Sequence, residues 1–266
     1  MKAGIIAAGE GSRLKSEGVV SLKPLVEVRG VPLIERLIRS YIRCGIEEIV
    51  CIVNESSLEV KRFVESKRFA IPVKFVVQTT PSSMHSLFAL APHLNEERFL
   101  LSTVDSIFNG DEFGSFLDYA RSPHAAEGVL AVTNFVDDEN PLYVQLDESW
   151  NILSFGGKGE KSAGPPSGTP RPAGRVGPET PFGNYGGRRT AASLESPWVT
   201  GGLYVLSPRI FSEIEAVLKR NIDRLRNFLA HLVKQGYRLE GYPFSRIIDV
   251  DRADDIRAAE ELLRTA

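Results

Sequence analysis

The chain has 266 residues, of which 42% are hydrophobic, so it can form one large domain or two small ones around a core buried between layers. Its 32 Lys and Arg residues nearly balance its 34 Asp and Glu residues, which leaves no overall positive field to attract nucleic acid or an anionic membrane. The composition therefore favours small-molecule chemistry, with no nucleic-acid or membrane partner.

Cysteine usage and the absence of long apolar segments indicate a reducing compartment. Cys44 and Cys51 lack the paired spacing of a zinc or redox site, and we interpret both as core thiols. No apolar stretch reaches the length of a membrane span, and Met1 leads into the first strand without a signal-peptide core. We expect a cytoplasmic protein.

The first predicted element is a buried strand at residues 3–8, which leads into Gly9-Glu10-Gly11-Ser12-Arg13. Glycines let the backbone approach a ligand closely and can turn several N–H groups toward one anion. The spacing fits neither a Walker loop nor a dinucleotide fingerprint, because Arg13 and Leu14 stand where the third glycine of the fingerprint would fall. Lys23-Pro24-Leu25 adds a second cation whose backbone the proline restrains. Together these residues predict a phosphate cradle.

Strand-like runs then alternate with amphipathic helical patterns up to about residue 125. The predicted strands cover residues 49–53, 73–77 and 99–104, and the predicted helices cover 33–42, 58–64 and a segment capped by Ser82. Such alternation builds an α/β fold, a three-layer, Rossmann-like and mostly parallel sheet flanked by helices. Ligands of these sheets bind at the carboxyl ends of the strands, where Gly9, Gln78 and Asp105 fall.

Beyond about residue 125 the pattern changes to short strands joined by turns. Runs at 129–133, 143–146 and 152–155 predict neighbouring strands, so this second part should be mixed or antiparallel. Residues 156–197 hold ten of the 23 glycines and seven of the 16 prolines, too many turn formers for a core element. The middle of this segment, about 162–189, lacks an apolar pattern that could dock it, and we predict disorder there.

Regular structure returns with a predicted strand at 198–206 that contains Thr200-Gly201-Gly202. Helices are predicted near 209–219 and 222–235, followed by a strand pair within 238–250 and a last helix from Arg252. The two glycines allow a backbone to approach a ligand closely, although a β-bulge explains them nearly as well.

Acidic residues follow two of the predicted strands. Asp105 comes directly after an apolar strand, so its carboxylate should emerge at the rim of the sheet. The alternative is a strand-end turn aspartate that bonds Asn109 or nearby backbone. In Ile248-Asp249-Val250-Asp251 the two aspartates share a face if the segment is extended. Asp251 could equally cap the last helix.

These motifs, in this order, resemble the sugar-1-phosphate nucleotidyltransferases and related MobA-like enzymes, which include phosphocholine and inositol-phosphate cytidylyltransferases. The resemblance covers almost the full length. It rests on Ala7-Ala8-Gly9-Glu10-Gly11-Ser12-Arg13-Leu14, Lys23-Pro24-Leu25, Ser102-Thr103-Val104-Asp105, Thr200-Gly201-Gly202-Leu203-Tyr204 and Ile248-Asp249-Val250-Asp251. It implies the nucleotide-diphospho-sugar transferase fold, a single domain at 1–266 with a nucleotide-binding part at 1–125 and an acceptor-binding part at 126–266.

Nucleotidyl transfer brings several negative charges together, so cations and aimed donors are the main catalytic need. We expect Arg13 to bind the β- and γ-phosphates and the departing pyrophosphate, and Lys23 to neutralise the α-phosphate. The nucleotide cradle implied by the resemblance consists of Ala8, Gly9, Gly11 and Ser12. Mg²⁺ prefers one or two carboxylates with waters and phosphate oxygens, and Asp105 suits that role. The resemblance implies Asp249 as the second carboxylate, with Asp251 as a further candidate.

Base and acceptor contacts are predicted on other loops. The amide of Gln78 can pair with a pyrimidine edge and the backbone at Ser83 can add a contact, but an amide that can flip leaves the base undecided, and the family often has glycine at the Ser83 position. The resemblance implies that Lys158 binds the phosphate of the second substrate and that Thr200 and Gly201 lie along the acceptor pocket.

We therefore expect a Mg²⁺-dependent enzyme that transfers a nucleotidyl group from a nucleoside triphosphate to a sugar-1-phosphate or polyol phosphate, with release of pyrophosphate. The alternative acceptors are phosphocholine, inositol phosphate and a molybdopterin. A regulatory nucleotide-sensing subunit is less favoured, because Arg13, Lys23 and the acidic residues are all present. The base, the acceptor and the oligomeric state stay open.

Overall fold

The parallel half of the central sheet has the predicted order of elements. The computed structural model describes residues 1–9, 11–123, 126–136, 140–156 and 197–265. Four parallel strands lie in the order β6 (Phe99–Thr103), β1 (Lys2–Ile6), β4 (Glu48–Val53) and β5 (Val73–Val77). β1 and β4 are almost entirely buried, as expected for strands that helices cover on both faces.

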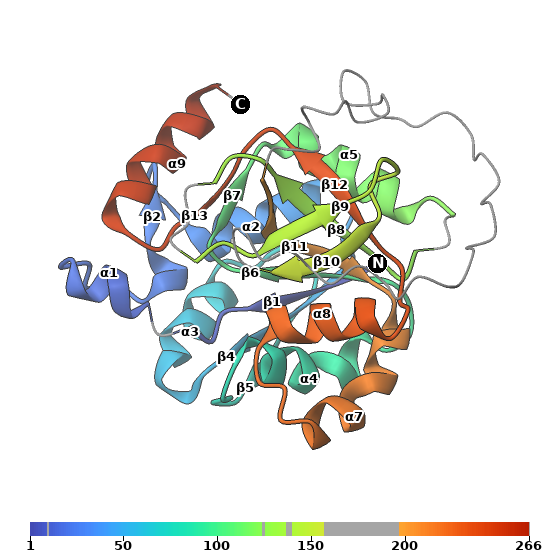
Figure 1. Ribbon diagram of the computed structural model, residues 1–266. Helices are drawn as coiled ribbons and strands as arrows, with labels where there is room; N and C mark the ends of the chain where they lie inside the picture. Colours follow the sequence, from blue (N-terminus) through green and yellow to red (C-terminus); the bar gives the residue numbers. More distant parts are fainter. Residues whose placement is uncertain (10, 124–125, 137–139, 157–196, 266) are drawn as a thin grey trace, which may run out of the picture.

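Helices cover both faces of this sheet (Figure 1). α2 (Leu33–Arg43) and α5 (Gly110–Arg121) contact each other through the stacked rings of Tyr41 and Phe113, whose centroids are 5.5 Å apart. α4 (Ser83–Leu94) packs on β1 and β4 and contacts α8 (Leu225–Lys234), while α3 (Leu58–Ser66) lies against β4 and β5. Ser82 accepts a hydrogen bond from the backbone of His85, which confirms its predicted role as the α4 cap.

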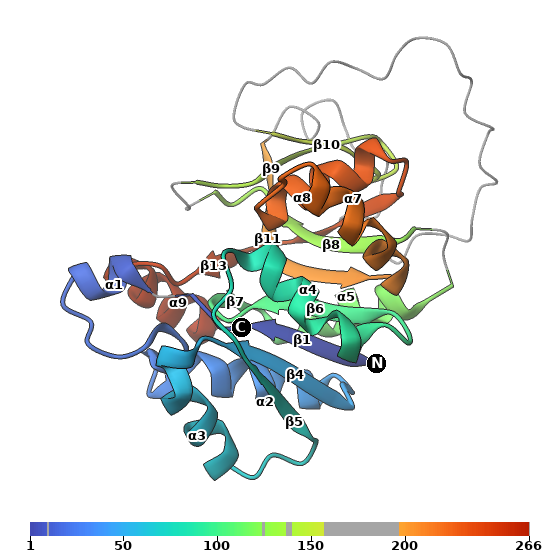
Figure 2. The ribbon, with the colours of Figure 1, turned by 90° about the horizontal axis from the view of Figure 1, so that it is seen from below.

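The second half extends the same sheet with mixed strands, as predicted. β11 (Trp198–Leu206) pairs antiparallel with β6, with β8 (Gly128–Thr133) and with β9 (Tyr143–Leu146), and β9 pairs antiparallel with β10 (Ile152–Gly156). β12 (Leu239–Phe244) runs parallel to β8. Figure 2 shows β8, β9, β10, β11 and α8 on one side of β1, with β4, β5 and α3 on the other. One sheet therefore runs through both parts, which supports a single domain with a boundary near residue 125; that division stays a prediction.

Two predictions for the end of the chain need correction. The helix expected near 209–219 forms as a 3-10 turn, Pro208–Glu213, that leads into the short α7 (Ile214–Lys219). The strands expected within 238–250 exist, but they do not pair with each other. β12 already has β8 as its partner, so β13 (Ile247–Asp249) leaves the sheet and pairs antiparallel with β7 (Ser106–Phe108), with Asp249 opposite Ser106.

A small apolar cluster, separate from the main core, holds this β7–β13 ribbon against both ends of the chain. It contains Leu14 of α1 (Ser12–Ser16), Val28 of β2 (Glu27–Val28), Ile107, Ile248, Val250 and Leu262 of α9 (Ala253–Thr265), among others. β2 pairs with β3 (Val31–Pro32), and α9 lies beside β2 (Figure 1). This packing brings residues near 250 next to the glycine turn.

The predicted disordered segment at 162–189 lies outside the described residues, and so does Lys158. Among the described helices, none has the length and apolar character needed to cross a membrane.

Candidate active site

The glycine turn after β1 leads into Arg13 on α1 and packs against Lys23. Gly11 has a φ of +60°, a left-handed conformation that favours glycine, and a Cβ built there would lie 3.0 Å from Cβ of Lys23. At Gly9 a Cβ would meet nothing within 4 Å. The carbonyl of Ala8 accepts a hydrogen bond of 3.1 Å from the amide of Asn54, a buried residue just after β4. Of the two glycines, Gly11 is therefore the one that the packing requires.

Lys23 is a buried cation between two carboxylates. It opens a 3-10 turn with Pro24, its side chain is 9% exposed, and its ammonium contacts Oδ2 of Asp105 and Oδ1 of Asp251. Burial alone would lower the pKa of Lys23, but the negative charges of Asp105 and Asp251 raise it well above its ordinary value. The ammonium is therefore charged throughout the physiological range.

The contact with Lys23 also favours the charged form of Asp105. Burial opposes its ionisation, yet the charge and hydrogen bond of Lys23 hold the pKa of Asp105 below its ordinary value. Its Oδ1 atom is buried and finds no hydrogen-bond donor among the described residues. The alternative contact to Asn109 is absent, because the Asn109 side chain caps α5 instead, accepting from the backbone N–H groups of Asp111 and Glu112.

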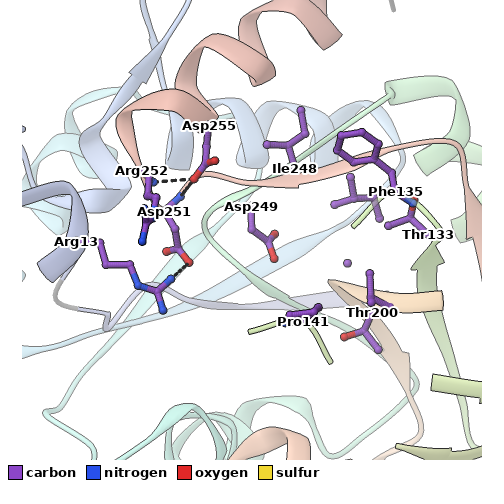
Figure 3. A pocket seen from close by; sticks show the side chains of 13 residues that line it. Arg13, Thr133, Phe135, Pro141, Thr200, Ile248, Asp249, Asp251, Arg252 and Asp255 are labelled. Carbon is purple, nitrogen blue, oxygen red and sulfur yellow. Dashed lines mark hydrogen bonds and ion pairs between the residues drawn. The ribbon is translucent and has the colours of Figure 1, made fainter. Parts of the chain in front are cut away.

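Asp251 binds both cations. Its Oδ1 contacts Lys23. Its Oδ2 accepts a 2.8 Å hydrogen bond from Nη1 of Arg13 (Figure 3). The predicted capping role falls to Asp255, whose Oδ2 accepts from the backbone N–H groups of Asp251 and Arg252 at 2.9 and 2.7 Å. The side chain of Asp251 thus faces the cations, while Asp255 shapes the turn into α9.

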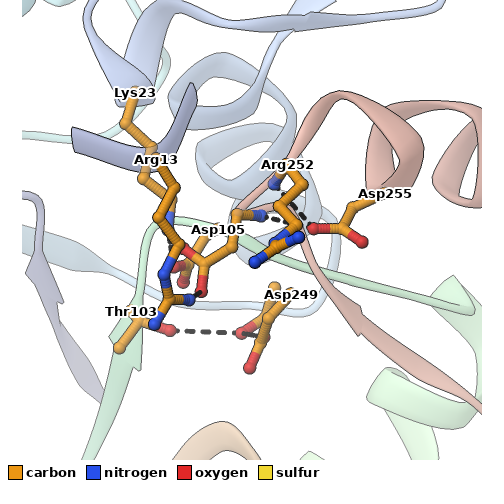
Figure 4. A network of polar contacts seen from close by, with 9 residues as sticks. Arg13, Lys23, Thr103, Asp105, Asp249, Arg252 and Asp255 are labelled. Carbon is orange, nitrogen blue, oxygen red and sulfur yellow. Dashed lines mark hydrogen bonds and ion pairs between the residues drawn. The ribbon is translucent and has the colours of Figure 1, made fainter. Parts of the chain in front are cut away.

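Asp249 lies in the same group of side chains but makes different contacts. Its Oδ1 accepts a 2.9 Å hydrogen bond from the buried hydroxyl of Ser106, which in turn lies 3.2 Å from the hydroxyl of Thr103. Figure 4 shows Asp249 beside Asp105 and below Arg252. The backbone joins the two segments as well, since the N–H of Val250 donates to the carbonyl of Asp105 at 3.0 Å.

A pocket opens beside these charged groups (Figure 3). Its polar side is formed by Arg13, Asp249, Asp251 and Arg252, and its other side by Thr200, Gly201, Phe135 and Pro141, among others. Two of the predicted acceptor residues, Thr200 and Gly201, therefore line the pocket that also contains the charged cluster.

The predicted base-binding residues lie on neighbouring strand ends. Gln78 follows β5, where its backbone N–H donates to the carbonyl of Val53 at 2.9 Å and its side chain is exposed. Ser83 is the first residue of α4. Both stand at the edge of the sheet where β1 ends in the glycine turn, because the strands are parallel. Their contact with a base stays a prediction.

Comparison with known proteins decides the family. Residues 3–235 match the model of the MobA-like NTP transferase domain. The chain belongs to this family. The mannose-1-phosphate guanylyltransferase catalytic subunit beta of Dictyostelium discoideum is 28% identical over 160 residues, which cover 58% of this chain and 44% of that protein. The bifunctional protein GlmU of Methanocaldococcus jannaschii is 24% identical over 269 residues, 99% of this chain and 54% of that one.

A solved structure has the same fold as this MobA-like transferase. The inositol-1-phosphate CTP transferase from T. maritima superposes with a TM-score of 0.72 at 18% identity, covering 99% of this chain and 96% of that one. The predicted nucleotide-diphospho-sugar transferase fold is thereby confirmed. This chain spans about half the length of the curated relatives that it matches, GlmU and the guanylyltransferase among them.

Sequence reasoning missed four residues that shape the site of the MobA-like transferase: Asn54, Ser106, Arg252 and Asp255. Asn54 directly follows β4 and Ser106 begins β7, and their place near strand ends is the signal that could have found them. Arg252 precedes α9 and Asp255 lies in its first turn, where an arginine and an aspartate fit ordinary helix chemistry.

Proposed function

We propose that this chain transfers a nucleotidyl group from a nucleoside triphosphate to a sugar-1-phosphate or polyol phosphate. The observation that carries the proposal is the convergence of Arg13 and Lys23 with Asp105, Asp249 and Asp251, which come from three distant segments of the chain. The family and the names of the relatives, a mannose-1-phosphate guanylyltransferase among them, support the same chemistry.

The reaction needs no covalent enzyme intermediate. A phosphate oxygen of the acceptor attacks the α-phosphorus of the triphosphate in line, a new P–O bond forms, and the bond from the α-phosphorus to the bridging oxygen breaks. The electron pair leaves with pyrophosphate. Positioning and charge stabilisation are the protein's main contributions to such a step.

The cations are held ready for the triphosphate. Lys23 neutralises charge at the α-phosphate and Arg13 binds the β- and γ-phosphates and the leaving pyrophosphate. Both cations contact Asp251, so a bound triphosphate would exchange phosphate oxygens for the Asp251 carboxylate. Because Lys23 is buried on a proline-restrained turn, little side-chain entropy remains to be lost when the nucleotide binds.

The carboxylates fit a magnesium ion. Within the described ranges, no group of three or more His, Cys, Asp or Glu side chains could hold a metal by itself. Mg²⁺ takes one or two carboxylates and completes its shell with waters and phosphate oxygens. Asp105, whose buried Oδ1 has no hydrogen-bond partner within the described part of the chain, and Asp249 would hold the ion. When bound, the ion would neutralise phosphate charge during transfer.

The acceptor side of the proposal rests on the pocket. Thr200 and Gly201 line it opposite Arg13, and Phe135 offers an apolar wall for the body of a sugar or polyol. The contact of Lys158 with the acceptor phosphate stays a prediction. Phosphocholine, inositol phosphate and a molybdopterin remain the alternative acceptors, and a cytoplasmic location stays an expectation.

Pyrophosphate release tests the proposal. Purified protein is incubated with Mg²⁺ and each pair from a panel of nucleoside triphosphates and sugar, polyol and choline phosphates, with Asp105→Asn as the inactive control. We expect product with at least one pair and strict dependence on both substrates. If the protein binds a triphosphate but no pair yields pyrophosphate, it is a nucleotide sensor and not a transferase.

A further inference from the structure

Two buried hydroxyls connect the end of β6 to the second carboxylate. Thr103 ends β6 and Ser106 begins β7, and the Ser106 side chain is almost completely buried. Their oxygens are 3.2 Å apart, and the Ser106 hydroxyl donates to Oδ1 of Asp249 at 2.9 Å. Because the Ser106 proton is directed to Asp249, Ser106 accepts in its contact with Thr103, whose hydroxyl also interacts with Asp105.

Glycine at position 202 is what leaves room for these hydroxyls. Gly202 has a φ of +72°, and a Cβ there would lie 2.5 Å from Oγ of Ser106 and 2.7 Å from Oγ1 of Thr103. The register of β11 against β8 shifts between Thr200 and Tyr204, so the glycine sits in an irregular part of the strand. Gly201 has a matching role, because its Cβ would lie 2.2 Å from Cδ1 of Ile247 in β13.

We propose that Ser106 is a positioning residue for Asp249, oriented by Thr103 and accommodated by Gly202. Its hydroxyl fixes Oδ1 of Asp249 and with it the orientation of a carboxylate that the proposed function assigns to a divalent cation. A hydrogen bond from an outer residue to a metal-binding carboxylate fixes its orientation, and losing such a bond weakens metal affinity. The inference rests on the proposed function, and it gives Gly202 a role in leaving room for the two hydroxyls.

The test measures metal binding directly. Full-length protein is saturated with a non-hydrolysable triphosphate analogue, and Mn²⁺ is titrated while free Mn²⁺ is followed by electron paramagnetic resonance. We expect Ser106→Ala to raise the Mn²⁺ dissociation constant about tenfold. The matched control is Ser102→Ala, which removes another buried serine hydroxyl of the same segment, outside this chain of hydroxyls, and should change the constant less than about twofold.

A double-mutant cycle shows whether Ser106 acts through Asp249. In an Asp249→Asn background, Ser106→Ala should have almost no further effect on the Mn²⁺ dissociation constant, because the carboxylate that it orients is gone. Thr103→Val keeps the side-chain shape and should also raise the Mn²⁺ dissociation constant, by a smaller factor. This second variant keeps the test available if Ser106→Ala does not fold, which circular dichroism reports.

The outcomes distinguish the role of Ser106 from the proposed function. An unchanged Mn²⁺ dissociation constant in folded Ser106→Ala protein, an equal rise in Ser102→Ala, or a full effect of Ser106→Ala in the Asp249→Asn background would overturn the role of Ser106. Failure of the unmodified protein to bind Mn²⁺ with the analogue would instead remove the proposed function itself.

Discussion

Lys23 and Asp105 lie 82 residues apart in the chain and form a buried ion pair at the carboxyl end of β6. Each residue keeps the other charged. Burial alone would lower the pKa of Lys23, but the nearby carboxylates raise it above its ordinary value. Burial alone would raise the pKa of Asp105, but the ammonium of Lys23 lowers it below its ordinary value. The same contact therefore keeps both the proposed catalytic cation and the proposed metal-binding carboxylate charged.

Removing the cation should damage both folding and turnover. Lys23→Gln leaves Asp105 buried without its countercharge, which costs about 3–5 kcal/mol of unfolding free energy. It also removes a positioned charge, so we expect kcat to fall by about 100-fold or more. Urea unfolding and pyrophosphate release measure the two effects. Lys15→Gln, an exposed lysine on α1, is the control and should change neither; equal losses in both variants would argue against a special role for Lys23.

Asp105→Asn should affect turnover more than nucleotide binding. The charge of the carboxylate, and of the ion that it would hold, matters most as the transition state forms, so kcat should fall by about 100-fold or more while the dissociation constant of the triphosphate changes little. The turnover rate and the dissociation constant of the triphosphate are measured on the same preparation. The exposed Asp118→Asn on α5 serves as control. Unchanged turnover in Asp105→Asn would remove Asp105 from the mechanism.

Acid should weaken the fold through Asp105. Because the pKa of Asp105 in the folded protein lies below its ordinary value of 3.8, its ionisation stabilises the fold above pH 3.8, and this contribution is lost as the pH falls through the folded pKa. The unfolding free energy of the wild type should therefore decrease more steeply between about pH 5 and pH 2 than that of Asp105→Asn. Urea unfolding at a series of pH values checks this. Parallel curves for the two proteins would contradict it.

The two glycines of the first turn should differ in their tolerance of a side chain. Gly11→Ala places a Cβ in a left-handed conformation and within 3.0 Å of Cβ of Lys23, so it should cost about 1–2 kcal/mol and raise KM for the triphosphate. Gly9→Ala meets no atom within 4 Å and is the matched control. Thermal unfolding and steady-state kinetics compare them. A larger loss in Gly9→Ala would mean that the ligand, and not the packing of Lys23, requires glycine in this turn.

Local patterns predicted much of this fold, because the information is local. The apolar run before Gly9, the capped helix at Ser82 and the carboxylate after β6 are each defined by a few neighbouring residues. The pairing of β13 with β7 was not predictable in this way, because strand partners are chosen across the whole chain. For the same reason the sequence alone could not decide whether Asp251 binds a metal or caps the last helix. Its contacts with Lys23 and Arg13 join residues that are 228 and 238 positions apart.

The ribbon of β7 and β13 has a consequence for the order in which this protein matures during synthesis. The glycine turn, Lys23 and Asp105 leave the ribosome long before Asp249 and Asp251 have been translated, and folding begins from the first-made segments. A nascent chain that stops before Ile247 would have the proposed triphosphate cradle without Asp249 and without the Asp251 carboxylate that Arg13 and Lys23 share. The proposed site would then be complete only after a strand of three residues has docked.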